Sequence, residues 1–169
     1  MVTAGRAVTD PGLLGIYLND HLAGATSGLE LARRAAGSQR GRPAGPMLER
    51  LRDEILKDRN ALREMMAALE VPVRRYKMYA AWAGEKAGRL KLNGRVVSRS
   101  PLSSLVELEM LRLGVEGKAA CWLTLRELAK RDDRLDADRL DELITRARQQ
   151  SETVEDLRLR AAGEAFGAR

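Results

Sequence analysis

The side chains of this sequence that could do chemistry are one histidine and a small number of carboxylates at helical spacing. His21 is the only histidine of the 169-residue chain. In the segment LRDEILKDRNAL (51–62), Asp58 falls on the apolar face of a predicted helix, and Glu54 lies at the edge of that face. An unpaired charge away from water is costly, so such a carboxylate must bind either a metal ion or hydrogen-bond donors.

Polar residues interrupt the apolar faces of the other predicted helices in the same way. The weak candidates for metal ligands are His21, Glu54, Asp58, Glu109 and Glu116. The residues near the midpoints of four different helices, which stacking would place in one layer, are His21, Asp58, Glu116 and Gln150. This layer could be a vestigial metal site, a weak carboxylate-rich site or a hydrogen-bonded polar core layer that fixes helix register. We expect the structural layer, in which Asp58→Asn should cost little stability.

Composition and prolines locate the helices that must position these residues. Helix-forming residues dominate, β-branched residues are few and only 4% of residues are aromatic, which indicates an all-α fold. Proline suits the first position of a helix, and Pro11, Pro46 and Pro101 each precede a long amphipathic segment. The predicted helices lie near 11–36, 46–69, 101–130 and 137–165. Residues 1–10 are predicted to be a mobile segment, followed by a single domain over 11–169.

The lengths of the connections between these helices predict the topology. Short connections favour two antiparallel hairpins, one in each half of the chain. Residues 71–100 are long enough to return along the bundle as a crossover that contains a shorter helix near 74–90. Gly114 and Gly117 weaken the helix over 101–130, and we expect another backbone to pack closely against them. The predicted fold is a four-helix bundle with one long crossover.

This arrangement, with polar residues at mid-helix core positions, resembles the ferritin-like superfamily over nearly the whole chain. The segment GEKAGRLKLNGRVVSRSPLSSLVELEMLRLGVEGK (84–118) is similar to a segment of uncharacterised ferritin-like bacterial proteins. In ferritin-like di-iron proteins, two helices each give a Glu and two others each give a Glu-x-x-His. This chain has Glu54-x-x-x-Asp58 in its second predicted helix and no histidine in its fourth. The resemblance therefore implies a ferritin-like four-helix bundle without a complete di-iron site.

The basic charge of the chain is concentrated in the predicted crossover. The formal net charge is +6, and residues 71–100 hold eight basic residues against one acidic residue, Glu85. The basic residues that could form a polyanion surface include Arg74, Arg75, Lys77, Arg95 and Arg99. The interleaved aromatic residues are Tyr76, Tyr79 and Trp82. We expect these aromatics to dock the crossover on the bundle, with at most weak, non-specific binding of nucleic acid or another polyanion.

Several features bound the cellular setting. The single cysteine, Cys121, cannot form an internal disulfide, and the start MVTAGRAVTD lacks the apolar run of a secretory signal. No segment approaches the roughly 18 uninterrupted apolar residues of a membrane span. The abundance of Arg over Lys is typical of a GC-rich bacterial genome. We expect a bacterial, cytoplasmic protein that does not enter the membrane.

The predicted function follows from an intact architecture with an incomplete ligand set. We expect a non-catalytic binding or assembly module without a cofactor. The first alternative is an oxidoreductase with carboxylate-bound iron or manganese, and the second is a polyanion binder that uses the basic crossover. The sequence leaves the physiological partner open, and it is compatible with a homo-oligomer.

Overall fold

The computed structural model describes residues 11–74 and 101–167, and these residues form four long helices and no strand. The helices are α1 (Pro11–Ser38), α2 (Gly45–Ala68), α4 (Pro101–Leu128) and α5 (Ala137–Phe166). Each bound lies within two residues of its predicted position. The all-α prediction is therefore confirmed for the described residues. Most of the predicted crossover, residues 75–100, lies outside them.

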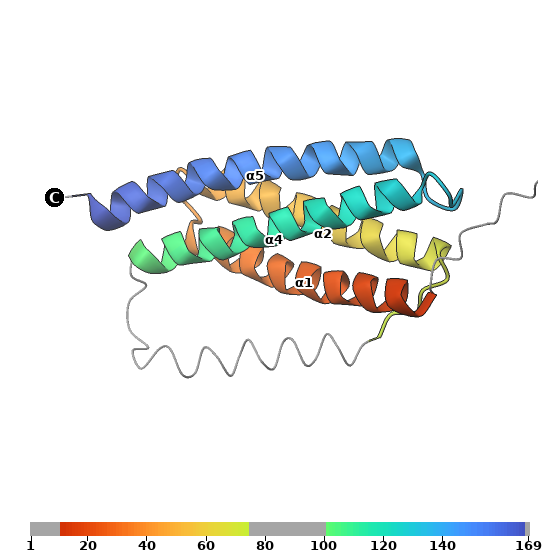
Figure 1. Cartoon of the computed structure of the whole chain (residues 1–169). Helices are drawn as coiled ribbons and strands as arrows, with labels where there is room; N and C mark the ends of the chain where they lie inside the picture. The colour runs from red at the N-terminus through yellow and green to blue at the C-terminus, as the bar shows by residue number, and fades with distance from the viewer. Residues whose placement is uncertain (1–10, 75–100, 168–169) are drawn as a thin grey trace, which may run out of the picture.

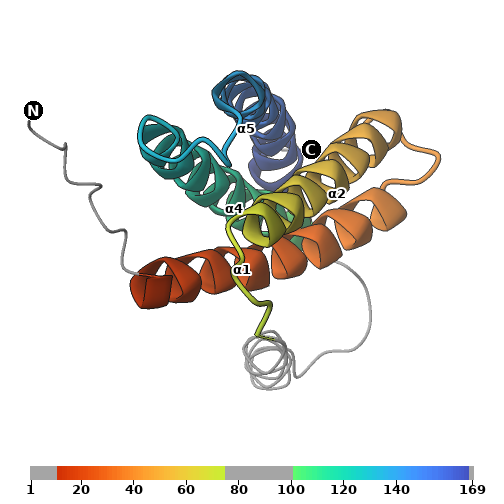
Figure 2. The same cartoon turned by 90° about the vertical axis from the view of Figure 1, so that its right-hand side faces the viewer.

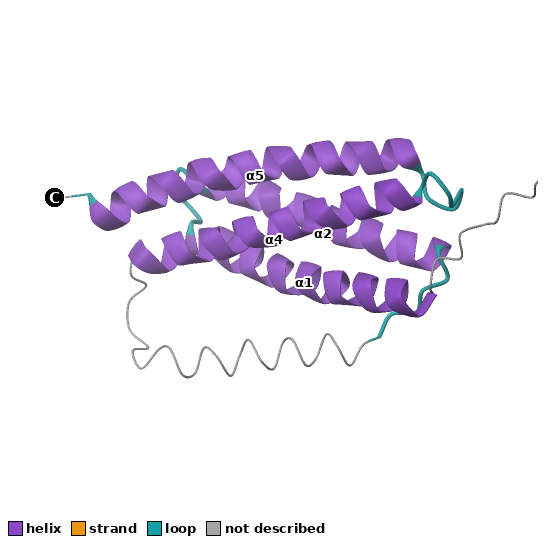
Figure 3. Ribbon diagram, viewed as in Figure 1, coloured by secondary structure: helices purple, strands orange, loops and turns teal. Residues whose placement is uncertain are grey.

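The four helices lie side by side as a bundle (Figures 1 and 3). The directions of α1 and α2 are opposite, as are those of α4 and α5, whereas α2 and α4 run in the same direction (Figure 1). The end view of Figure 2 shows α1 beside α2 and α4 beside α5, and α1 also packs against α4. The end of α2 and the start of α4 consequently lie at opposite ends of the bundle.

Local sequence sets the starts of these helices. Pro46 lies in the first turn of α2, where its missing N–H leaves no hydrogen bond unmade. At the start of α5, the Asp136 side chain accepts a hydrogen bond from the backbone N–H of Arg139 at 3.1 Å. This bond satisfies one of the amides that the first turn of a helix leaves free.

A buried asparagine ties the chain after α2 back to α1. Asn19 on α1 is 2% exposed, and its Nδ2 donates to the carbonyl oxygen of Pro72 at 3.0 Å. Its Oδ1 accepts from the backbone N–H of Arg74 at 2.6 Å. One side chain therefore satisfies two backbone groups of an irregular segment, which fixes the path of the chain as it leaves α2.

The apolar core consists of two separate clusters along the length of the bundle. One cluster includes Leu22 on α1 and Trp122 on α4, and the other includes Leu29 on α1 and Leu157 on α5. The buried side chains of Asp58 on α2 and Gln150 on α5 lie between the two clusters, with the partly buried Lys118 of α4 beside them. Among the described residues, no helix combines the length and the apolar character needed to cross a membrane.

Among the described residues, no backbone packs closely against the α4 glycines, contrary to the prediction. A Cβ atom built on Gly114 or Gly117 would meet no atom of the described residues within 4 Å. The same is true of Gly24 and Gly28 on the neighbouring helix α1. Because small residues on α1 face small residues on α4, the two helices leave a space between them where larger side chains would otherwise interdigitate.

We expect Gly114→Ala to raise the free energy of unfolding by about 1 kcal/mol, because alanine favours a helix and the added methyl group meets no described atom. The control is Gly45→Ala in α2, where the new Cβ would lie 2.5 Å from the carbonyl oxygen of Gln39 and should destabilise the fold. Urea unfolding measures both changes. A loss of stability in Gly114→Ala would mean that another part of the protein packs against this position.

Candidate functional site

The carboxylate of Asp58 on α2 lies in the interior of the bundle and is bound by two cations. The residue is 1% exposed. Lys118 Nζ, from α4, lies 2.5 Å from Oδ2, and Arg146 Nη1, from α5, lies 2.9 Å from Oδ1. The two ion pairs therefore join three of the four described helices at one point.

Gln150 on α5 completes the hydrogen bonding around this carboxylate. The residue is 1% exposed, and its Nε2 donates to Asp58 Oδ2 at 3.1 Å and to Glu54 Oε2 at 3.0 Å. Its Oε1 accepts a hydrogen bond from Lys118 Nζ. The side-chain amide thus binds a carboxylate through its nitrogen and an ammonium group through its oxygen. Hereafter, the polar cluster means Glu54, Asp58, Lys118, Arg146 and Gln150.

The polar cluster is balanced in charge. Two carboxylates, Glu54 and Asp58, face two cations, Lys118 and Arg146. Burial lowers the pKa of Lys118 from its ordinary value, and the nearby Asp58 carboxylate offsets part of this effect. A buried ion pair is stable only when each charge keeps its partner and its remaining hydrogen bonds are made. The contacts of Gln150 meet the second condition.

The structure brings together part of the predicted polar core layer. Asp58 and Gln150 lie in contact. Glu116 lies outside the layer: its side chain is exposed and accepts a hydrogen bond from Ser151. The physical reason is rotation about the helix axis, because Glu116 projects from a different side of α4 than its core face. His21 is half-buried and lies at a cavity, not in the hydrogen-bonded cluster.

Sequence reasoning missed the two cations, although Lys118 carries a recognisable signal. The core face of α4 repeats at intervals of three and four residues, and its members include Leu111, Val115, Trp122 and Leu125. Lys118 occupies the position of this repeat between Val115 and Trp122. A lysine on a core face opposite an aspartate on another core face indicates a buried ion pair. Arg146 has no such signal, since its side chain is 34% exposed and lies at the edge of α5.

The predicted metal ligands do not gather at one place. Among the described residues, no group of three or more His, Cys, Asp or Glu side chains could hold a metal ion. Glu109 lies near the surface, 3.8 Å from Arg158, and is separate from Glu54 and Asp58. Both oxygens of Asp58 already bind cations of the protein. These residues therefore do not fit a carboxylate site for iron or manganese.

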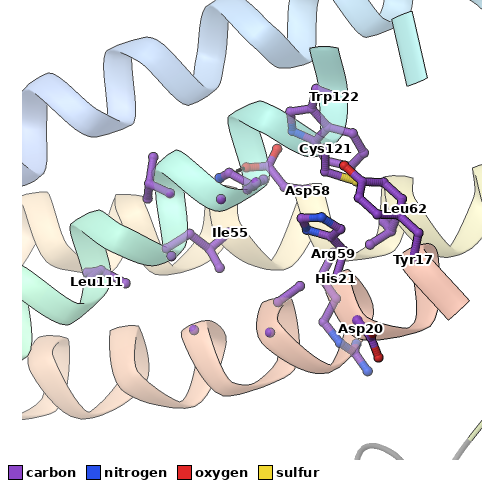
Figure 4. A pocket seen from close by; sticks show the side chains of 17 residues that line it. Tyr17, Asp20, His21, Ile55, Asp58, Arg59, Leu62, Leu111, Cys121 and Trp122 are labelled. Carbon is purple, nitrogen blue, oxygen red and sulfur yellow. Dashed lines mark hydrogen bonds and ion pairs between the residues drawn. The ribbon is translucent and has the colours of Figure 1, made fainter. Parts of the chain in front are cut away.

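A cavity of about 310 Å³ lies beside the polar cluster, between α1, α2 and α4. Figure 4 shows it from close by, with Tyr17 and His21 from α1 facing Cys121 and Trp122 from α4. The lining is mostly apolar and includes the four glycines of α1 and α4 named above. Exposed Gly24 marks the rim of the cavity. Asp58 and Lys118 contribute to its wall.

The polar groups of the cavity are held in uncharged or paired forms. Burial lowers the pKa of His21 below its ordinary value of 6.5, so its imidazole is neutral at pH 7. The His21 ring meets the Tyr17 ring edge-on, with centroids 4.5 Å apart. The hydroxyl of Tyr17 donates to Thr124 Oγ1 at 3.1 Å. Burial raises the pKa of the Cys121 thiol to about 12, so this cysteine is not a reactive thiolate.

The candidate polyanion surface is mostly outside the described residues. Arg74 is described, and its backbone is held by Asn19. The remaining predicted members, which are Arg75, Lys77, Arg95 and Arg99, fall in 75–100 and lie outside the described part of the chain. The docking of Tyr76, Tyr79 and Trp82 on the bundle concerns the same segment. Both proposals therefore stay predictions.

We expect Asp58→Asn to lower the free energy of unfolding by about 3 kcal/mol or more, because it leaves the buried Lys118 ammonium without its anion. This replaces the small cost suggested by the sequence. The control is Arg112→Gln, which breaks a half-exposed pair with Glu155 at 2.7 Å and should cost less than about 1 kcal/mol. Urea unfolding compares them. Equal, small losses would show that water reaches the charge of Lys118.

We expect the NMR titration of His21, the single histidine, to show a pKa below 6.5. Because the folded state disfavours the charged imidazole, the unfolded state binds more protons as pH falls below about 6.5, and stability falls with it. The His21→Gln variant should lose this part of the pH dependence while keeping the part due to carboxylates. A midpoint above 6.5 would contradict a desolvated imidazole.

Comparisons with known proteins add no relative. No protein-family model, curated protein or solved structure matches this chain. The features of the described residues that bear on function are the polar cluster and the adjacent cavity.

Proposed function

We propose that this chain is a non-catalytic binding protein that holds a small, largely apolar molecule in the cavity between α1, α2 and α4. The observation that supports the proposal is the cavity itself, a space of about 310 Å³ lined mainly by apolar groups and opened by four glycines. Ligand sites are typically concave, apolar and furnished with a few placed polar groups. The half-buried His21 and Tyr17 are residues of the lining that carry such groups.

A lack of activated groups supports a binding role over a catalytic one. The Cys121 thiol is neutral, since burial raises its pKa to about 12. Asp58 and Lys118 are bound to each other, so neither is free to exchange a proton with a bound molecule. A general acid or base must reach its substrate with a proton to give or a free lone pair to receive one. The paired residues of this wall instead give the cavity a fixed polar edge.

A ferritin-like bundle stays part of this proposal, and the polar cluster favours a chain of that kind without a di-metal centre. In this proposal, the ammonium of Lys118 and the guanidinium of Arg146 supply the positive charge that the interior carboxylate requires. The alternative of an iron or manganese oxidoreductase would need these cations to leave Asp58. A polyanion binder remains a second alternative that concerns residues 75–100. We retain a bacterial cytoplasm as the proposed location and a homo-oligomer as an open assembly state.

We expect tetralin, an uncharged bicyclic hydrocarbon, to stabilise the protein. At ten times its dissociation constant, a ligand of the folded state adds about 1.4 kcal/mol, which raises the melting temperature by roughly 3–6 °C for a domain of this size. Gly28→Leu should abolish the shift, because the new side chain occupies the cavity. Differential scanning fluorimetry and calorimetry measure the effect.

The matched control for this experiment is Gly37→Leu on the same helix. Gly37 is exposed and does not line the cavity, so its substitution gains the same helix propensity without filling the site. Tetralin should stabilise this variant as it does the parent chain. No stabilisation of the parent chain would contradict the proposal. Stoichiometric iron or manganese in the same preparation, lost in Asp58→Ala, would favour the oxidoreductase instead.

A further inference from the structure

The cavity is elongated along the axes of the helices that form it. Its lining runs from Tyr17 to Gly28 on α1 and from Leu111 to Trp122 on α4. At 1.5 Å per residue, each of these helix segments is about 16 Å long. The Tyr17 hydroxyl donates to Thr124 of α4, so Tyr17 and Trp122 lie at the same end of the cavity. Figure 4 places Leu111 at the other end.

Four glycines keep the cavity open along this length. Gly24 and Gly28 on α1 and Gly114 and Gly117 on α4 all line it. A Cβ atom built on any of them would meet no described atom within 4 Å. The two glycines of each helix are about one turn apart, so both helices present bare backbone over successive turns. The missing side chains therefore leave one continuous space along the helices.

The inner wall of the cavity favours a hydrocarbon over a polar group. Ile55 and Leu62 of α2 and Val115 of α4 supply apolar surface. The charged residues of this wall, Asp58 and Lys118, are bound to each other. A polar group of a ligand would have to compete with that ion pair, whereas a CH₂ group gains free energy simply by leaving water.

The cavity opens to water at the side of the bundle. Asp20 and Gly24 on α1 and Gly114 on α4 line the cavity and are exposed. A molecule in the cavity can therefore keep a polar end in water at this rim while its apolar part lies against the helices. This arrangement avoids the cost of burying a polar group without a partner.

Volume and length give similar limits on the size of the ligand. A cavity of about 310 Å³ is roughly twice the volume of an engineered apolar cavity that holds benzene, so it has room for about twelve carbons. Its length of about 16 Å is close to half of the roughly 30 Å hydrocarbon core of a bilayer, the depth that one lipid chain spans. An extended chain matches both limits, whereas a ring system of as many carbons would leave the ends empty.

We propose that the cavity binds a single unbranched hydrocarbon chain of about ten to twelve carbons, with its polar end in water at the exposed rim. This inference rests on the proposed function and names the class of molecule that is bound, the chain of a single-chain lipid.

The test is a series of uncharged ligands from 1-hexanol to 1-dodecanol, with binding measured by isothermal titration calorimetry. Each CH₂ group that enters the cavity should tighten binding about fourfold. The gain should continue to at least about ten carbons, because the cavity has room for them. A compact cavity would instead give no further gain beyond about six to eight carbons.

Filling one end of the cavity should shorten the preferred chain. Gly28→Leu places a leucine side chain at the Leu111 end, so affinity should stop rising at about eight carbons. A flexible chain can occupy the length that remains, which a rigid bicyclic body such as tetralin cannot. The matched control, Gly37→Leu, lies outside the cavity on the same helix and should behave as the parent chain does.

A measurement on the parent chain does not depend on the folding of either variant. With one 1-decanol bound per chain, NMR should show NOEs from one end of the ligand to the Tyr17 ring and from its other end to the Leu111 methyl groups. These two side chains lie at opposite ends of the cavity (Figure 4). Only an extended chain can reach both.

The outcomes separate this inference from the proposed function. A gain that stops at about six to eight carbons in the parent chain, or NOEs confined to one end of the cavity, would overturn the extended chain while leaving the binding role intact. The same holds if Gly28→Leu and Gly37→Leu show equal chain-length dependence, or if tetralin binds and no 1-alkanol does. Failure of tetralin and of the whole series to bind the parent chain would contradict the proposed function itself.

Discussion

The buried ion pair between Asp58 and Lys118 is the constraint on which the rest of this bundle depends. Neither charge can lose its partner away from water without a large cost, so α2 and α4 can pack only in the register that joins them. Apolar stripes alone repeat every three or four residues and tolerate a slip of one turn, which moves a helix by about 5.4 Å. Gln150 and Arg146 extend the same constraint to α5, because each binds Asp58 from that helix.

The cavity exists because α1 carries glycines where larger side chains would otherwise fill the space. The polar cluster takes its side chains from α2, α4 and α5, and α1 presents Gly24 and Gly28 to the adjoining space. The apolar clusters on either side of the polar cluster hold the helices in place, so that the space does not close by local collapse. An unfilled cavity destabilises a protein, and alanine at these glycines would favour the helix. Retaining four glycines around one space is therefore a structural cost that ligand binding would offset.

Sequence reasoning recovers the helices and part of the polar cluster for identifiable physical reasons. Proline positions and apolar periodicity are local signals, and they place the ends of the four described helices to within two residues. Asp58 and Gln150 are predicted correctly because each interrupts an apolar stripe. Glu116 has the right position along α4, but it projects from a side of the helix other than the core face. The partnership of Lys118 depends on which helix faces which, and the cavity depends on missing volume. Neither of these properties is encoded in any single segment.

The positive charge beside the interior carboxylate of Asp58 comes from side chains of the chain itself. A carboxylate at the centre of four helices needs a cation, and a metal ion would impose several ligands, an open coordination position and redox chemistry. Lysine and arginine supply that charge as permanent parts of the chain, with hydrogen bonds that occupy both oxygens of Asp58. The interior carboxylate is thereby committed to holding the helices together. In the proposed function, a second molecule would bind in the neighbouring cavity, where the small residues of α1 and α4 leave room for it.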